Sequence, residues 1–155
     1  MSYLFAVVIA VAVVLLTTIV HYEAVRLLEG FARHPRHGHR AVLMGVTSAL
    51  ILVHLAEIGL YALVYWLASG PLGLGRFVGG EMGWADYFHY AAETYASLGS
   101  GDLHTEGDMR LIAAVSPLNG ILLLAWSGAF LFSLFDQLRQ GPPAVPASDA
   151  PPPRG

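Results

Sequence analysis

Three long runs of apolar residues alternate with polar segments along the chain. The first, residues 3–20, is uncharged, and at 1.5 Å per residue it would extend about 27 Å, close to the roughly 30 Å hydrocarbon core of a bilayer. The second, 43–67, is interrupted only by His54 and Glu57, and the third, 111–135, carries no charge. A cleaved signal peptide fits the first run poorly, because no basic residue precedes it and no small-residue cleavage site follows it. The pattern predicts three membrane-spanning helices.

The composition agrees with a membrane protein. The chain has 155 residues, the length of one domain, and is 55% hydrophobic and only 12% charged, where soluble domains carry about 25% charged residues. There is no cysteine, which excludes disulfides and thiolate metal sites. All eight basic residues are arginines spread along the chain, so we expect membrane lipid as a partner and no nucleic acid.

The loops predict an orientation. Residues 23–41, between the first two runs, hold four arginines, whereas the region between the second and third runs holds six acidic residues against Arg76 and the flanking Arg110. Arginine-rich loops mark the cytoplasmic side. We therefore expect a multi-pass protein of the cell membrane, with the N-terminus outside and the C-terminus in the cytoplasm.

A segment between the second and third runs is too short to span. It begins as an aromatic, amphipathic helix near Trp84 and continues into a Gly-x-Gly-Asp turn. Such a helix and turn before a spanning helix is the layout of a cation-channel pore, where backbone carbonyls replace the hydration shell of the ion. Irregular backbone survives at membrane depth only where protein buries it or water lines it. One loop cannot close a pore, but four copies around an axis can, which predicts a homotetramer.

The turn resembles the pore of the potassium-channel superfamily, whose filter is commonly Thr-Val-Gly-Tyr-Gly-Asp. The matching residues are Ser97, Leu98, Gly99, Ser100, Gly101 and Asp102. Glu93-Thr94 and Gly120, ten residues after Arg110, also match positions of that family.

Over residues 10–137 the chain is similar to small bacterial proteins of the potassium channel family. The shared features are a first helix ending near His21, the segment His54-Leu55-Ala56-Glu57, Asn119-Gly120, and Ala125-Trp126-Ser127.

The resemblance implies an all-α membrane protein that conducts cations passively. It has three transmembrane helices, with a re-entrant pore helix and filter between the second and third. The expected parts are a first helix (1–22), a basic cytoplasmic loop (23–41), a pore module (42–137) and a disordered, Pro-rich cytoplasmic tail (138–155). Within the module we expect an outer helix (42–68), a pore helix and filter (84–102) and an inner helix (110–136).

The resemblance also assigns roles to residues. Potassium would pass the carbonyls of Ser97, Leu98, Gly99, Ser100 and Gly101, supported by Glu93, Thr94 and Asp102, with Asn119 and Gly120 as cavity lining and gating hinge. No cofactor, and no metal besides the permeant K⁺ or another monovalent cation, is implied.

Two filter positions differ from the family pattern. Ser97 replaces threonine and keeps a hydroxyl, whereas Ser100 replaces a tyrosine that packs outward and holds the diameter of the filter. Serine cannot span that gap, so the hypothesis is weaker discrimination of potassium from sodium than is usual in the family.

Polar residues inside the predicted spans have two interpretations each. An intramembrane charge costs about 2.5–3.5 kcal/mol on insertion scales, so His54 and Glu57, three residues apart on one helical face, must face protein or water. They are either a proton- or metal-sensitive gate or a hydrogen-bonded strut. Glu93 either shares a proton with Asp102 or is a structural partner. Asn119 either lines the cavity or forms an interhelical hydrogen bond.

Two other functions compete with conduction. A non-conducting subunit could keep the pore fold. A membrane haem or metal protein could use His21 and His54, but the predicted topology puts His21 at the inner face and His54 near mid-bilayer, and it pairs no histidines on facing helices. We find no nucleophile–base constellation and no phosphate loop, so the chain is not expected to be an enzyme.

Overall fold

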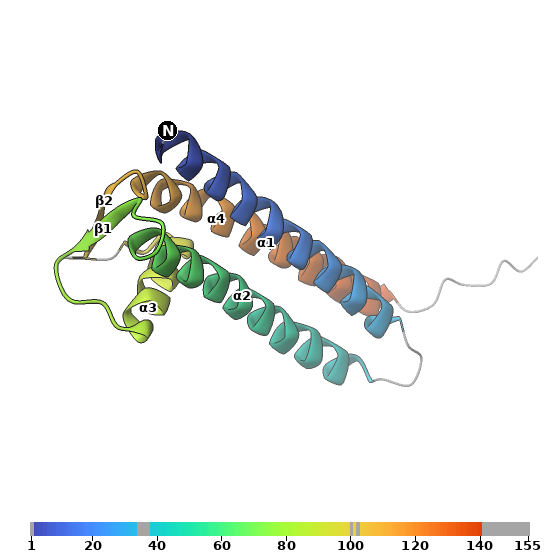
Figure 1. Ribbon diagram of the computed structural model, residues 1–155. Coiled ribbons are helices and arrows are strands. Elements are labelled where there is room, and N and C mark those ends of the chain that lie inside the picture. The colour runs from blue at the N-terminus through green and yellow to red at the C-terminus, as the bar shows by residue number, and fades with distance from the viewer. Residues whose placement is uncertain (1, 34–37, 100, 102, 141–155) are drawn as a thin grey trace, which may run out of the picture.

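Three helices of equal length dominate the structure (Figure 1). A computed structural model describes residues 2–33, 38–99, 101 and 103–140. Its long helices are α1 (Ser2–Ala32), α2 (His39–Ser69) and α4 (Arg110–Gln140), each of 31 residues and long and apolar enough to cross a membrane. The predicted number of such helices, and the mainly helical fold class, are confirmed.

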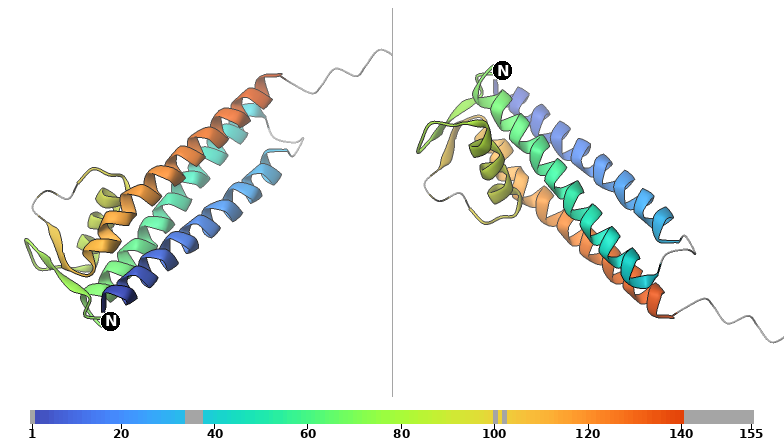
Figure 2. Two further views of the ribbon diagram at one scale, coloured as in Figure 1. Left: turned by 90° about the horizontal axis from the view of Figure 1, so that it is seen from above. Right: turned by 90° about the horizontal axis from the view of Figure 1, so that it is seen from below.

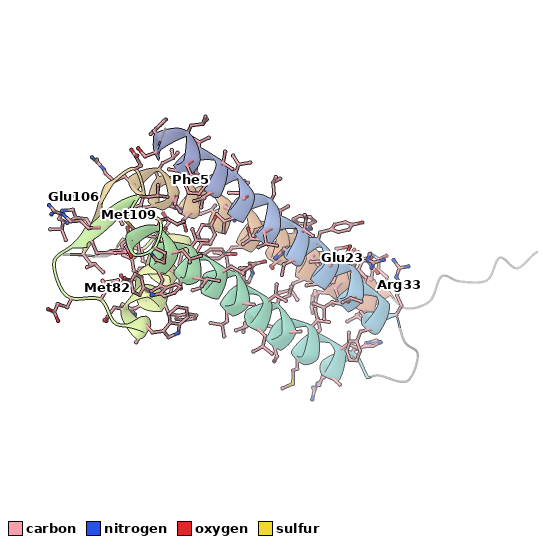
Figure 3. The ribbon with its side chains drawn as sticks, viewed as in Figure 1. Phe5, Glu23, Arg33, Met82, Glu106 and Met109 are labelled. Carbon is pink, nitrogen blue, oxygen red and sulfur yellow. The ribbon has the colours of Figure 1, made fainter. Side chains whose placement is uncertain are left out.

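Helix α1 continues ten residues beyond its predicted end at residue 22. The predicted basic loop is therefore mostly helix, and α2 already begins at His39. The reason lies in the charge pattern of residues 23–33: Arg26 pairs with Glu23 at 2.7 Å and Arg33 with Glu29 at 3.7 Å, three and four residues apart, which are spacings that support a helix. Figure 3 shows Glu23 and Arg33 toward the end of the bundle where α1 meets the connection to α2.

Between α2 and α4 the chain forms a short helix and two strands. Helix α3 (Trp84–Tyr95) begins at the predicted residue, and the Gly83 N–H before it donates to Asp86 Oδ2 at 2.8 Å. Strands β1 (Gly75–Val78) and β2 (His104–Gly107) pair antiparallel, with Gly75 opposite Gly107. These two strands were not predicted, because strands of four residues in Gly-rich segments carry almost no periodic signal.

Helices α2 and α4 contact each other and lie between α1 and α3. Helix α1 lies against both of them, and α3 packs against both on the side away from α1 (Figure 2). The main core lies near the end that carries the strands, and its large buried side chains are Tyr61, Tyr65, Tyr90, Tyr95, Met109 and Ile112. A smaller apolar cluster fills the opposite end of the bundle.

The C-terminal end of α3 touches the backbone of α4. A methyl group on Gly120 would overlap the carbonyl oxygen of Tyr95 and lie 2.9 Å from its carbonyl carbon. Gly120 is ten residues along α4 from Arg110, or about 15 Å along the helix axis. Helix α3 therefore ends well inside the length of α4. The structure gives Gly120 a packing role, while its role as a gating hinge stays a prediction.

Replacing Gly120 should loosen this contact. We expect Gly120→Ala to lower the free energy of unfolding by about 1–3 kcal/mol, because the added methyl forces α3 and α4 apart. Chemical or thermal unfolding in detergent micelles measures the change. The matched control is Gly128→Ala in the same helix, where a Cβ meets nothing within 4 Å and alanine is the better helix former. Equal stability of the two variants would contradict the tight contact.

Candidate functional site

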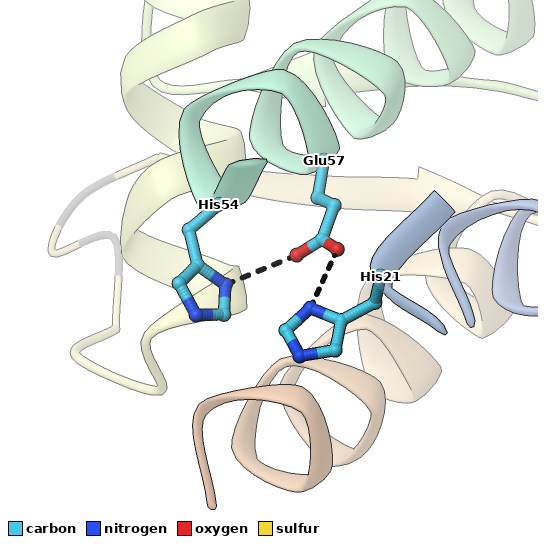
Figure 4. Close-up of side chains that lie close together, drawn as sticks. All are labelled: His21, His54 and Glu57. Atoms are coloured by element: carbon cyan, nitrogen blue, oxygen red, sulfur yellow. Dashed lines mark hydrogen bonds and ion pairs between the residues drawn. The ribbon is translucent and has the colours of Figure 1, made fainter. Parts of the chain in front are cut away.

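A buried polar network joins all four helices. Its members are His21 from α1, His54 and Glu57 from α2, Tyr95 from α3 and Ser127 from α4. We call these five residues the four-helix network. In Figure 4 the side chains of His21, His54 and Glu57 point toward one another from two neighbouring helices.

The Glu57 carboxylate is the centre of the network. Its Oε1 lies 3.0 Å from His21 Nδ1, and its Oε2 lies 3.0 Å from His54 Nδ1. The Tyr95 hydroxyl donates to Oε2 at 2.6 Å. A carboxylate without exposed surface needs such partners, because neither water nor lipid reaches it.

The second nitrogen of each histidine faces helix α4. His54 Nε2 lies 2.9 Å from Ser127 Oγ, and His21 Nε2 lies 3.4 Å from the same oxygen. The centroids of the two imidazole rings are 5.3 Å apart. The pair of rings is thus enclosed between Glu57 on one edge and Ser127 on the other.

The prediction that His21 and His54 lie at different depths is wrong. Because α1 continues to Ala32 and runs antiparallel to α2, His21 is about 17 Å and His54 about 22 Å from the ends of the helices that the connection joins. Ending the first helix near His21 had placed this residue at the membrane surface. Counting equal lengths along the chain from the midpoint of residues 33–38 places His21 opposite residue 50, about one helical turn from His54.

A second set of hydrogen bonds lies closer to the strands. Asn119 Nδ2 donates to Thr17 Oγ1 at 2.7 Å and to the Tyr61 hydroxyl at 3.1 Å, and all three side chains are buried. Asn119 therefore forms interhelical hydrogen bonds within one chain, which link α4 to α1 and α2. This is the second of the two roles considered for it from the sequence. A role in lining a cavity stays a prediction.

The segment predicted as a filter follows directly on α3. The Ser97 N–H donates to the Thr94 carbonyl at 3.0 Å and the Leu98 N–H to the Glu93 carbonyl at 2.8 Å, a Schellman-type helix end with Ser97 in the left-handed region (φ 60°). Gly99 and Gly101 also have positive φ, of 82° and 57°.

The residues predicted to support the filter are only partly described. Thr94 is buried and its hydroxyl donates to the Tyr90 carbonyl at 2.7 Å. The Glu93 carboxylate lies 3.2 Å from His89 Nε2, one helical turn away. Ser100 and Asp102 lie outside the described residues, and with them the predicted contact between Glu93 and Asp102.

No family model matches this chain, and neither a curated protein nor a solved structure matches it. The resemblance to potassium channels therefore stays an expectation, and the function is argued from the residues and their geometry.

Removing the central carboxylate should unfold the bundle more easily. We expect Glu57→Ala to lower the free energy of unfolding by about 3–5 kcal/mol, because His21, His54 and Tyr95 lose a buried partner. The control is Glu106→Ala, which removes an exposed carboxylate 2.8 Å from Arg76 and should change stability by less than about 1 kcal/mol. Unfolding curves in one detergent compare the two; a similar small effect would mean that Glu57 does not stabilise the fold.

Proposed function

We propose that this chain is a passive cation channel that assembles as a homotetramer and conducts potassium past the backbone carbonyls of residues 97–101. The first helix starts outside the cell, the connection between α1 and α2 faces the cytoplasm, and the C-terminus is cytoplasmic. The arginines between the first two spans and the acidic residues between the last two support this orientation.

The observation that carries the proposal is an exposed segment, neither helix nor strand, that begins beside the apolar helix α4. Residues 96–99 and Gly101 are exposed, and Leu98 keeps 77% of its surface. They follow Tyr95, whose carbonyl lies against Gly120, about 15 Å along α4 from Arg110. Lipid offers no hydrogen bonds to such peptide groups, so they must be covered by protein or line water.

A ring of four chains would supply both the protein that covers these peptide groups and the water that they line. Neighbouring copies cover the outer side of the segment, and the inner sides together enclose a water-filled axis. The backbone angles suit such a lining. Gly99 and Gly101 have positive φ, which a residue with a Cβ adopts only at a cost, whereas the left-handed Ser97 belongs to the Schellman-type end of α3. Glycines at alternate positions give a filter the backbone freedom to point its carbonyls at an ion.

Bi-ionic recording tests conduction directly. With potassium chloride on one side of a planar bilayer and sodium chloride on the other, we expect cation current and a reversal potential shifted toward potassium. Gly99→Ala should remove most of the current, because a Cβ at φ 82° is strained by about 1–2 kcal/mol in each of four copies. Gly80→Ala, at a loop position where a Cβ meets nothing within 4 Å, should conduct as the parent does.

If no current is recorded, the oligomeric state of the protein shows which part of the proposal is wrong. A folded tetramer without current at any pH or tension tried would favour the non-conducting subunit. A folded monomer in lipid nanodiscs would refute the tetrameric pore itself.

Selectivity provides a second test, on a residue outside the described part of the chain. If Ser100 leaves the filter without its usual outward brace, Ser100→Tyr should raise the permeability ratio of potassium to sodium, by about tenfold for each ~1.4 kcal/mol of regained discrimination. Ser97→Thr, which keeps the hydroxyl, is the matched control and should leave the ratio unchanged. An unaltered ratio in Ser100→Tyr would refute the loosened-filter hypothesis.

A further inference from the structure

We infer that the four-helix network is a binding site for a divalent transition-metal ion such as Zn²⁺, with His21, His54 and Glu57 as ligands. The proposal does not rest on conduction, since the site lies between helices of one chain. One donor atom from each of the three residues lies within 4.8 Å of the other two. Imidazole nitrogen and carboxylate oxygen are the donors of many zinc sites. This proposal departs from the expectation that the chain holds no metal besides permeant ions.

The spacing of the donors suits a tetrahedral ion. Ligands about 2.0–2.1 Å from zinc at tetrahedral angles are roughly 3.3 Å from one another. Here each histidine Nδ1 is 3.0 Å from a different oxygen of Glu57, and the three donors lie within 4.8 Å of one another, so an ion would draw them together by up to about 1.5 Å. The Tyr95 oxygen, 3.0 Å from His54 Nδ1 and 2.6 Å from Glu57 Oε2, occupies the place where a fourth ligand or a bound water would lie.

The hydrogen bonds of the two imidazole rings to Ser127 also favour a bound ion. If both rings donate from Nδ1 to Glu57, both Nε2 atoms face Ser127, whose hydroxyl has one proton and can satisfy only one neutral ring. With an ion on both Nδ1 atoms, both Nε2–H groups donate to the two lone pairs of Ser127. This outer contact is the arrangement that orients metal-binding histidines.

One edge of the site is uncovered within a single chain. His21 and Glu57 have no exposed side-chain surface, whereas His54 keeps 13% of its own. The His54 edge is therefore the part of the site that an ion could reach without unpacking the helices.

Cobalt titration of the full chain tests the site. Protein without a histidine tag is stripped with a chelator in detergent and titrated with Co²⁺, whose visible absorption reports a four-coordinate nitrogen and oxygen site. We expect one equivalent per chain at micromolar affinity, and displacement of the colour by Zn²⁺.

Variants locate the ion. His21→Gln and Glu57→Gln should weaken binding at least a hundredfold, and Ser127→Ala, which keeps all three ligands, about 10–100-fold. The control His39→Ala/His104→Ala removes two exposed histidines and should bind as the parent does. Absence of a one-equivalent site in the parent protein would overturn the proposal even if the variants fail to fold. Binding that survives in folded His21→Gln and Glu57→Gln would overturn it as well.

Discussion

The Glu57 carboxylate lies inside a bundle that is apolar enough to cross a membrane, and its position constrains every helix around it. Its partners come from α1 and α3 as well as from its own helix, and α4 closes the network through Ser127. A buried carboxylate that loses one donor is strongly destabilised, so rotating or sliding any of these helices is penalised. The network therefore sets the rotation and depth of all four helices, which apolar contacts among Val, Leu and Ala side chains specify only loosely.

Tyr95 connects this network to the segment proposed as a filter. Its hydroxyl is bound to Glu57, and its carbonyl rests on the backbone of Gly120. Both ends of one residue are thus held, two positions before Ser97. In the proposed channel, a change in the four-helix network would reach the start of the filter through Tyr95. The two interpretations of His54 and Glu57, a structural strut and a gate, are therefore compatible. The same hydrogen bonds that brace the helices would act as a gate if a proton or an ion changed the bond between Glu57 and Tyr95.

Much of the fold could be predicted from the sequence, because apolar run length specifies a spanning helix almost directly. The start of the short helix at Trp84 followed from its aromatic, amphipathic pattern. The end of α1 could not be found in this way, since Glu23, Arg26, Glu29 and Arg33 resemble a polar loop unless their helical pairing is counted. The pairing of His21 with Glu57 depends on where that helix ends, so one error in a boundary concealed the site. Periodicity shows which face of a helix is polar, but the partner of that face is a property of the packing.

The buried polar side chains and the segment after α3 differ in how far one chain encloses them. Glu57, His21 and Asn119 find their hydrogen bonds within the chain. Residues 96–99 and Gly101 are instead exposed, beside a contact about 15 Å along α4, although the N–H groups of residues 96–98 bond to carbonyls of α3. The long helices satisfy most of their own peptide groups, so lipid can cover their outer faces at little cost. In the proposed channel, further copies of the chain are therefore needed at this segment, and the tetramer would bring four such segments, rather than four helix faces, to a common axis.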